Sequence, residues 1–164
     1  MGEGIKDPLG LESNFKEVKG VGLLPVMTTL EGQKVVRRVT GSCLYNKKRI
    51  SGYEIHMGLT SPTGSGGKPF LKVHLPGGKK AWTDGWVLDN GRVAGTYVHG
   101  ILDSPGFRGE FLNTMRRAKG LNNKKPKQGR LARFHQYDRL ADHFEAHCDV
   151  EKIIKVLLRS YPHV

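Results

Sequence analysis

The sequence is poor in cysteine and in long apolar runs, and both shortages exclude classes of protein. Its two cysteines, Cys43 and Cys148, stand far apart in 164 residues, so neither a disulfide framework nor a zinc-ligand spacing is present. We expect both to be buried or inert free thiols. The longest apolar run, residues 21–27, is short and broken by proline, which excludes a membrane span. The start lacks the order of a signal peptide, and Lys6 departs from a myristoylation motif, so we expect a cytoplasmic protein.

Acidic residues are also scarce. The chain has 15 Asp and Glu against 27 Lys and Arg, a net charge of +12, which attracts nucleic acid, an anionic surface or a polyanionic small substrate. The densest basic run, residues 122–130, contains proline and glycine and is therefore predicted to be a loop. We favour a solvated loop over nucleic-acid recognition, which would show steeply salt-dependent binding.

Glycine, by contrast, is abundant, with 22 residues, and predicts many turns in one globular domain. The most informative stretch, residues 95–100 (GTYVHG), is a β-like run that ends in His99 and Gly100. Before it, Asn90 and Gly91 indicate a tight type I′ turn, so residues 86–88 and 92–99 are predicted to form a hairpin. In α/β enzymes the catalytic base is often a histidine at the end of a sheet strand. The other interpretation is a polar residue that simply ends the strand.

Alternation and turn residues predict further strands at residues 35–39, 50–57 and 70–75, with the first two paired antiparallel. In the second, Glu54 and His56 share one face. Residues 1–20 and 60–67 are predicted to be loops, because they are rich in glycine, proline and polar residues and show little periodicity.

The period then changes to that of helices. Ser104 and Pro105 predict a helix start, and the four-residue spacing of Phe107, Phe111 and Met115 predicts a buried stripe, with Gly120 as the stop. A second helix is predicted over residues 134–147, with Leu140 and Phe144 facing inward. Asp149 is predicted to cap a last helix whose apolar residues at 153–158 form a core face.

Three segments carry a family resemblance: residues 52–60 (GYEIHMGLT), 93–105 (VAGTYVHGILDSP) and 137–143 (YDRLADH). In that order they resemble the C-terminal glutamine amidotransferase domain of the cobyric acid synthase family, and residues 7–13 and 20–26 fit the same family. The resemblance covers nearly the whole chain. It implies an α/β, flavodoxin-like class I amidotransferase fold, here the C-terminal portion, with a mixed sheet, antiparallel hairpins and flanking helices.

The family's chemistry uses a cysteine on a strand-to-helix elbow, activated by a histidine that takes its proton. His99 matches that histidine. The cysteine of the family lies in a glycine-rich motif immediately before the segment that residues 1–5 match, and neither Cys43 nor Cys148 has an elbow context. We therefore expect a partial amidotransferase domain over residues 1–164, without the elbow segment and the ATP-dependent synthetase domain, and inactive by itself.

Other polar residues are weaker candidates. Glu54, His56 and Tyr97 are predicted to contact the glutamine substrate, although His56 fits a strand histidine bonded to backbone equally well. Asp103 or Glu54 would orient His99 through a hydrogen bond, or would have a solvated or capping role. The i, i+4 pair of His143 and His147 has a spacing that could bind zinc, but a solvent-exposed polar helix face is the simpler interpretation.

The resemblance implies a part of cobyric acid synthase, which converts adenosylcobyrinic acid a,c-diamide to cobyric acid by glutamine-dependent, ATP-driven amidation of corrin carboxylates in cobalamin biosynthesis. The expected partners are glutamine and, through the synthetase domain, the corrin polycarboxylate, with no membrane or nucleic acid. No cofactor is expected on this chain, since ATP and Mg²⁺ belong to the synthetase domain. The alternative is a non-catalytic or split amidotransferase module that docks to a synthetase partner.

Overall fold

The computed structural model describes residues 1–89, 91–126 and 129–160 and divides the chain into two compact units, Met1–Pro126 and Lys127–Val164. Asn90 and, in the basic run, Lys127 and Gln128 lie outside the described residues. Ten strands and the helix α1 lie in the first unit, and the helices α2 and α3 lie in the second.

The larger sheet has six strands in the order β10-β5-β4-β7-β8-β9, all paired antiparallel. The strands are β4 (Val35–Cys43), β5 (Arg49–His56), β7 (Lys68–His74), β8 (Ala81–Val87), β9 (Ala94–Gly95) and β10 (Val98–His99). They confirm the strands and hairpins predicted from alternation. The β8–β9 register, with Trp86 opposite Gly95 and Val87 opposite Ala94, is the one expected for a turn centred on residues 90–91.

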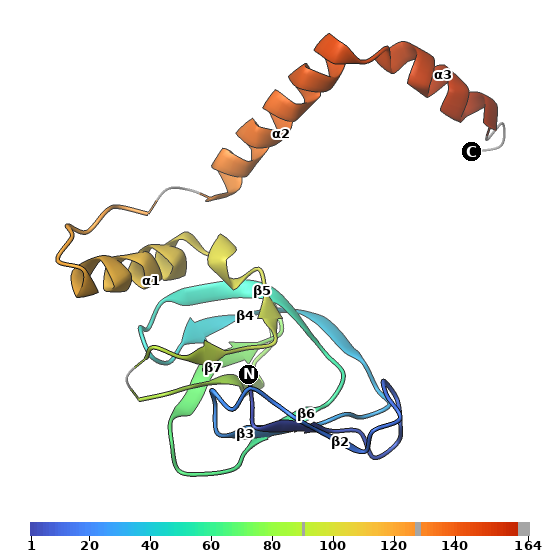
Figure 1. The fold of residues 1–164 in the computed structure, drawn as a ribbon. Helices are drawn as coiled ribbons and strands as arrows, with labels where there is room; N and C mark the ends of the chain where they lie inside the picture. The colour runs from blue at the N-terminus through green and yellow to red at the C-terminus, as the bar shows by residue number, and fades with distance from the viewer. Residues whose placement is uncertain (90, 127–128, 161–164) are drawn as a thin grey trace. The chain divides into compact units, whose positions relative to one another are not determined.

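The predicted strand over residues 92–99 is interrupted. Its first part, β9, pairs with β8, whereas its second part, β10, pairs with β5 at the opposite edge of the sheet. Only Thr96 and Tyr97 separate the two parts, so the sheet curls until its edges are joined by these two residues (Figure 1). Alternation alone does not reveal such a switch, because both parts keep the extended conformation.

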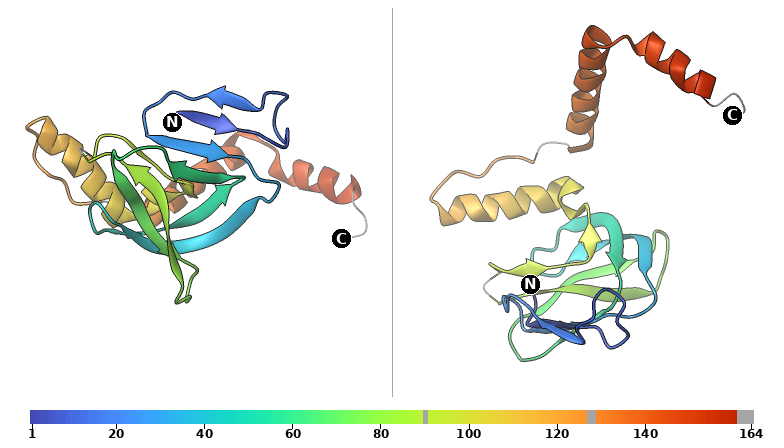
Figure 2. Two further views of the ribbon diagram at one scale, coloured as in Figure 1. Left: turned by 90° about the horizontal axis from the view of Figure 1, so that it is seen from below. Right: turned by 45° about the vertical axis from the view of Figure 1, so that its right-hand side comes forward.

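A smaller four-stranded sheet has the order β2-β1-β3-β6, with β1 and β3 parallel and the other pairs antiparallel. Its strands are β1 (Gly4–Lys6), β2 (Glu17–Lys19), β3 (Val26–Thr29) and β6 (Leu59–Pro62). Figure 2 shows the blue strands of this sheet beside the curled larger sheet. The loop predictions for residues 1–20 and 60–67 were therefore wrong in part, because strands of three or four residues are too short to show alternation.

The loop between β1 and β2 is organised by Asp7. Its carboxylate accepts hydrogen bonds from the backbone N–H groups of Leu11, Glu12 and Ser13, at 2.8, 2.9 and 3.1 Å. The bonds from Glu12 and Leu11 are the main reason that the pKa of Asp7 lies below its ordinary value. An aspartate side chain thus replaces secondary structure in this segment.

The 3₁₀ helix η1 (Ile101–Asp103) and the helix α1 (Pro105–Ala118) follow β10 and contact β5 (Figure 1). Pro105 starts α1 as predicted, but the Ser104 hydroxyl does not cap the helix. It accepts a hydrogen bond of 3.0 Å from the Ser51 N–H of β5 and so ties the helix start to the sheet. Of the predicted stripe only Phe107 is buried, since Phe111 and Met115 are 40% and 49% exposed.

The core of the first unit lies inside the curled sheet and beneath α1. It consists of apolar side chains from β4, β5, β7, β8, β10 and α1: Val39, Cys43, Ile50, Phe70, Leu71, Val73, Val87, Val98 and Phe107. Cys43 is fully buried, as predicted. The architecture is mixed α/β, with sheets, antiparallel hairpins and a flanking helix, in agreement with the predicted class; a flavodoxin-like topology stays a prediction.

The second unit contains α2 (Gly129–His147) and α3 (Val150–Ser160). Asp149 caps α3 as predicted, since its Oδ1 accepts the Lys152 N–H at 2.9 Å. The predicted inward faces were wrong: Leu140, Phe144 and the apolar residues of α3 are each about half exposed, and Cys148 is exposed as well. Amphipathic spacing identifies an apolar face but not what covers it. No helix in the described part of the chain is long and apolar enough to cross a membrane.

Candidate functional site

His99 ends β10, as the sequence predicts. It lies opposite Tyr53 in the antiparallel register with β5, and both side chains are exposed. No other described residue forms a hydrogen bond or ion pair with its imidazole. Gly100 follows with φ of 76°, a left-handed conformation that favours glycine and turns the chain into η1.

Gly52 makes the approach of β10 possible. A Cβ at position 52 would lie 2.2 Å from the His99 carbonyl oxygen and 2.7 Å from Val98 Cγ1. Only glycine therefore allows β10 to lie this close to β5, and the position of His99 depends on it.

Glu54 lies on the other face of the same strand pair, because it is opposite Val98 and not His99. It is 3% exposed and accepts two hydrogen bonds from Arg37, at 2.8 Å from Nε and 3.2 Å from Nη2. Burial raises the pKa of Glu54, but the hydrogen bonds and charges of Arg37 and His56 outweigh it, so the pKa lies below its ordinary value of 4.5. Glu54 is therefore a buried carboxylate already held by two basic groups, and it forms no hydrogen bond with His99.

His56 joins Glu54 to the following turn. Its Nε2 lies 3.1 Å from Glu54 Oε1, and its Nδ1 donates to the Gly58 carbonyl oxygen at 2.8 Å. Both ring nitrogens face oxygen acceptors, so both bonds form at once when the ring carries two protons. Gly58 has φ of 148°, and a Cβ there would lie 2.5 Å from the Thr29 carbonyl oxygen. Gly52 and Gly58 of the GYEIHMG block are therefore explained by close packing against neighbouring backbone, which leaves no room for a side chain.

Tyr97 stacks on His56, with ring centroids 4.7 Å apart. Its hydroxyl forms a hydrogen bond of 2.6 Å with the Thr60 hydroxyl, which bonds in turn to Thr28 at 2.7 Å. The structure therefore brings Glu54, His56 and Tyr97 into one network that connects the two sheets. His99 belongs to the opposite face of the β5–β10 pair.

Asp84 holds the two residues that join the sheet edges. It accepts a hydrogen bond from the Thr96 hydroxyl and a weaker one, 3.4 Å, from the Tyr97 N–H, while Thr96 Oγ1 accepts the Val98 N–H at 3.0 Å. Burial is the main reason that the pKa of Asp84 is raised, and the neighbouring Glu54 charge adds to it. Sequence analysis missed Asp84 and Arg37, because nothing in a strand pattern marks which charged residue faces inward.

The two cysteines have different surroundings. Cys43 is fully buried in the core, and Cys148 lies in the second unit. Within the described ranges, no three His, Cys, Asp or Glu side chains are grouped to hold a metal ion. His143 and His147 stack at 4.3 Å, and His147 Nδ1 donates to the His143 carbonyl oxygen, as on an ordinary solvated helix face.

One known family matches the part of the chain that contains these residues. The model of the CobB/CobQ-like glutamine amidotransferase domain matches residues 1–107, which include His99 and all ten strands of the described residues. The chain belongs to this family. The match ends within the first turn of α1, so it covers both sheets of the first unit.

Individual members of the amidotransferase family extend the likeness over both units. Cobyric acid synthase from Geobacillus thermodenitrificans is 40% identical over 159 residues, 96% of this chain and 30% of the relative. The proteins of the same name from Clostridium botulinum (strain ATCC 19397) and Clostridium acetobutylicum are each 38% identical, over 160 and 157 residues, 96% of this chain and 32% and 31% of their own lengths. The chain thus spans about a third of the length of these relatives.

Proposed function

We propose that this chain supplies the histidine of the Cys-His pair with which a cobyric acid synthase hydrolyses glutamine. The observation that carries the proposal is His99 in a family of glutamine amidotransferases: it is exposed at the end of β10, and its imidazole has no bonding partner among the described residues. The ammonia released serves the ATP-driven amidation of corrin carboxylates in cobalamin biosynthesis, in keeping with the name that its relatives carry.

His99 acts as a base toward a thiol that comes from residues outside this sequence, because Cys43 is fully buried and Cys148 follows the end of the helix α2 and not a strand-to-helix elbow. His99 takes the thiol proton, and the thiolate attacks the side-chain amide carbon of glutamine. The carbon–nitrogen bond breaks, and the imidazolium returns the proton to the departing ammonia. Water then cleaves the thioester, which releases glutamate and restores the thiol.

Glu54, His56 and Tyr97 have a supporting role in the proposed function, on the other side of the β5–β10 pair. Their mutual hydrogen bonds and ring contact fix residues 96–98, directly before His99. This supports a positioning role for Glu54, whose oxygens are occupied by Arg37 and His56. Contact of His56 or Tyr97 with glutamine remains part of the proposal.

A chimaera tests the assignment of His99. The chain is joined to the remaining residues of the Geobacillus thermodenitrificans relative, and glutamate release from glutamine is measured. We expect hydrolysis by the chimaera, none by the chain alone, and a loss of about 10³-fold in kcat for His99→Ala in the chimaera. His135→Ala, an exposed histidine of α2, is the control and retains full activity.

Undiminished hydrolysis by the His99→Ala chimaera would remove His99 from the mechanism. The alternative of a split enzyme predicts that the chain and the remaining residues of the relative, mixed as separate polypeptides, regain hydrolysis. A different result would favour a non-catalytic docking module. In that case the chimaera folds and the two separate polypeptides bind each other, but neither preparation hydrolyses glutamine.

A further inference from the structure

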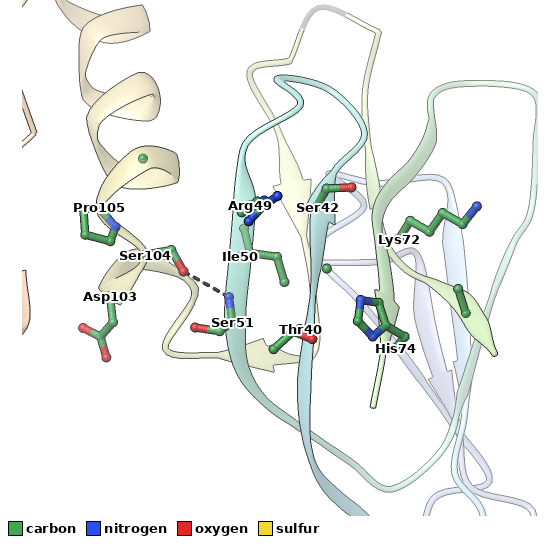
Figure 3. A pocket seen from close by; sticks show the side chains of 13 residues that line it. Thr40, Ser42, Arg49, Ile50, Ser51, Lys72, His74, Asp103, Ser104 and Pro105 are labelled. Atoms are coloured by element: carbon green, nitrogen blue, oxygen red, sulfur yellow. Dashed lines mark hydrogen bonds between the residues drawn. The ribbon is translucent and has the colours of Figure 1, made fainter. Parts of the chain in front are cut away.

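The outer face of the six-stranded sheet carries a second polar site, in a pocket of about 810 Å³ between β4, β5, β7 and the start of α1 (Figure 3). The strand registers arrange its side chains in two rows across the sheet. Arg49, Ser42 and Lys72 form one row, because Ser42 lies opposite both of the others. Ser51, Thr40 and His74 form the next row.

The first row places two cations on the two sides of one hydroxyl. Neighbouring strands are about 4.8 Å apart, so Arg49 and Lys72 start about 10 Å from each other with Ser42 between them. Figure 3 shows the Arg49 side chain near Ser42 and the Lys72 side chain extended the other way, so Lys72 reaches the same point by a change of rotamer.

These charges are not neutralised by the described part of the protein. The side chains of Arg49 and Lys72 are exposed and form no hydrogen bond or ion pair with a described residue. The single carboxylate that lines the pocket belongs to Asp103, and Figure 3 shows it turned away from the strands. The two positive charges repel one another at this spacing, and an anion bound between them is attracted to both, which offsets that repulsion.

The second row adds hydrogen-bond donors. His74 Nδ1 donates to the Leu75 carbonyl oxygen at 2.8 Å, so Nε2 is the ring nitrogen that remains to meet a ligand. Ser51 and Thr40 contribute hydroxyls, and Gly106, in the first turn of α1, also lines the pocket. The free N–H groups of that turn favour negative charge, which agrees with the cationic row.

We propose that this pocket binds a compact oxyanion of charge two or more, with phosphoryl or carboxylate groups held between Arg49 and Lys72 above Ser42. The site does not depend on the hydrolysis of glutamine. His99 lies on the same sheet face, opposite Tyr53. Along β5, Tyr53 is the next residue on that face after Ser51, which belongs to the second row. The oxyanion therefore binds beside the glutaminase histidine and not at it.

Titration of the full chain with pyrophosphate and, separately, with citrate tests the proposal, by calorimetry and by amide chemical shifts. We expect saturable binding of one of them, with shifts centred on Ser42, Ser51 and Gly106. Preference for pyrophosphate identifies a phosphoryl ligand, and preference for citrate identifies a polycarboxylate. The double variant Arg49→Gln, Lys72→Gln should bind at least 10-fold more weakly, and Ser42→Ala several-fold more weakly.

The matched control is Lys79→Gln, Lys80→Gln, which removes the same charge from the turn between β7 and β8, outside this pocket. It should bind as the unchanged chain does. Equal weakening in both double variants would mean general attraction by net charge and would overturn the site. Absence of saturable binding of either anion, or shifts confined to other surfaces, would overturn it as well. All four residues are exposed, so the variants keep the fold, which thermal unfolding verifies.

Discussion

At the scale of single residues, burial and partners separate carboxylates that look alike in the sequence. Glu54 and Asp84 are both buried, but Glu54 has Arg37 and His56 beside it, whereas the hydrogen-bond donors to Asp84 among the described residues are the neutral groups of Thr96 and Tyr97. Their pKa values consequently move in opposite directions. Sequence analysis identified Glu54 and His56 as neighbours on one face, because alternation in a long strand is reliable. It could not identify Arg37 or Asp84 as their surroundings, since these contacts depend on how the sheet curls.

Replacement of Glu54 by glutamine should lower the free energy of unfolding by about 2 kcal/mol at pH 7, between the values of exposed and buried ion pairs. Because the folded pKa of Glu54 is lowered, its contribution is complete above the ordinary value of 4.5 and is lost as the pH falls through the folded pKa. Urea unfolding at pH 7 and pH 3 measures the difference. Glu110→Gln, which breaks the exposed pair with Arg117, should cost less than 1 kcal/mol. Equal costs for the two variants would contradict this account.

Asp84 and Asp7 should give opposite pH dependences. The raised pKa of Asp84 means that the folded state binds its proton more tightly, so the stability it contributes falls as the pH rises above 3.8 toward the folded pKa. The lowered pKa of Asp7 means that its contribution is present above 3.8 and is lost below it. Thermal unfolding of Asp84→Asn and Asp7→Asn from pH 3 to 7 should show that rising pH favours the first variant and disfavours the second, relative to the unchanged chain. Parallel curves would refute the assignment.

At the scale of elements, His99 owes its place to one strand pair. The sequence predicted its position at a strand end, and the turn at residues 90–91 predicted the register of β8 with β9. The switch of partner at Thr96 and Tyr97 was not predictable, because it depends on the edges of a six-stranded sheet meeting in space. The short strands β1, β2 and β6 escaped prediction for a different reason: each is too short to carry a period.

Gly52→Ala tests the close approach of β5 and β10. The added Cβ would overlap the His99 carbonyl oxygen, so β10 must shift, at a cost of about 1–3 kcal/mol in the free energy of unfolding. In the chimaera described above, glutamine hydrolysis should fall together with stability. Gly32→Ala is the matched control, since no atom lies within 4 Å of its Cβ position, and it should be neutral. An unaffected Gly52→Ala protein would show that β10 tolerates displacement.

At the scale of the whole molecule, the two units differ in how their apolar residues are used. Among the residues whose burial is described, the whole buried core belongs to the first unit, whereas Phe134, Leu140 and Phe144 of α2 and Ile153, Ile154, Leu157 and Leu158 of α3 are about half exposed or more. The span of α3 was predicted from its Asp149 cap and apolar spacing, whereas the prediction for α2, residues 134–147, began later than the helix, which starts at Gly129. The burial of neither helix was predictable, because a helix sequence shows an apolar face without showing its partner.

A chain shortened to residues 1–126 should therefore keep the fold of the first unit. We expect its unfolding midpoint in a calorimeter to remain within a few degrees of that of the full chain, because no core residue is removed. In sedimentation, the full chain should self-associate as concentration rises and the shortened chain should stay monomeric. Cooperative unfolding lost on shortening, or equal association of both, would contradict the division into units.

The joining of the sheet edges by Thr96 and Tyr97 also bears on aggregation. Strands at the edge of a sheet present unpaired backbone groups that recruit strands of other molecules, and long edges are the most dangerous. In the described sheets, the edge strands β2, β6, β9 and β10 have only three, four, two and two residues. These edge strands are themselves too short to template a long pairing with a second molecule, so the exposed backbone at the edges of the larger sheet is that of β5 and β8 where β10 and β9 leave them unpaired.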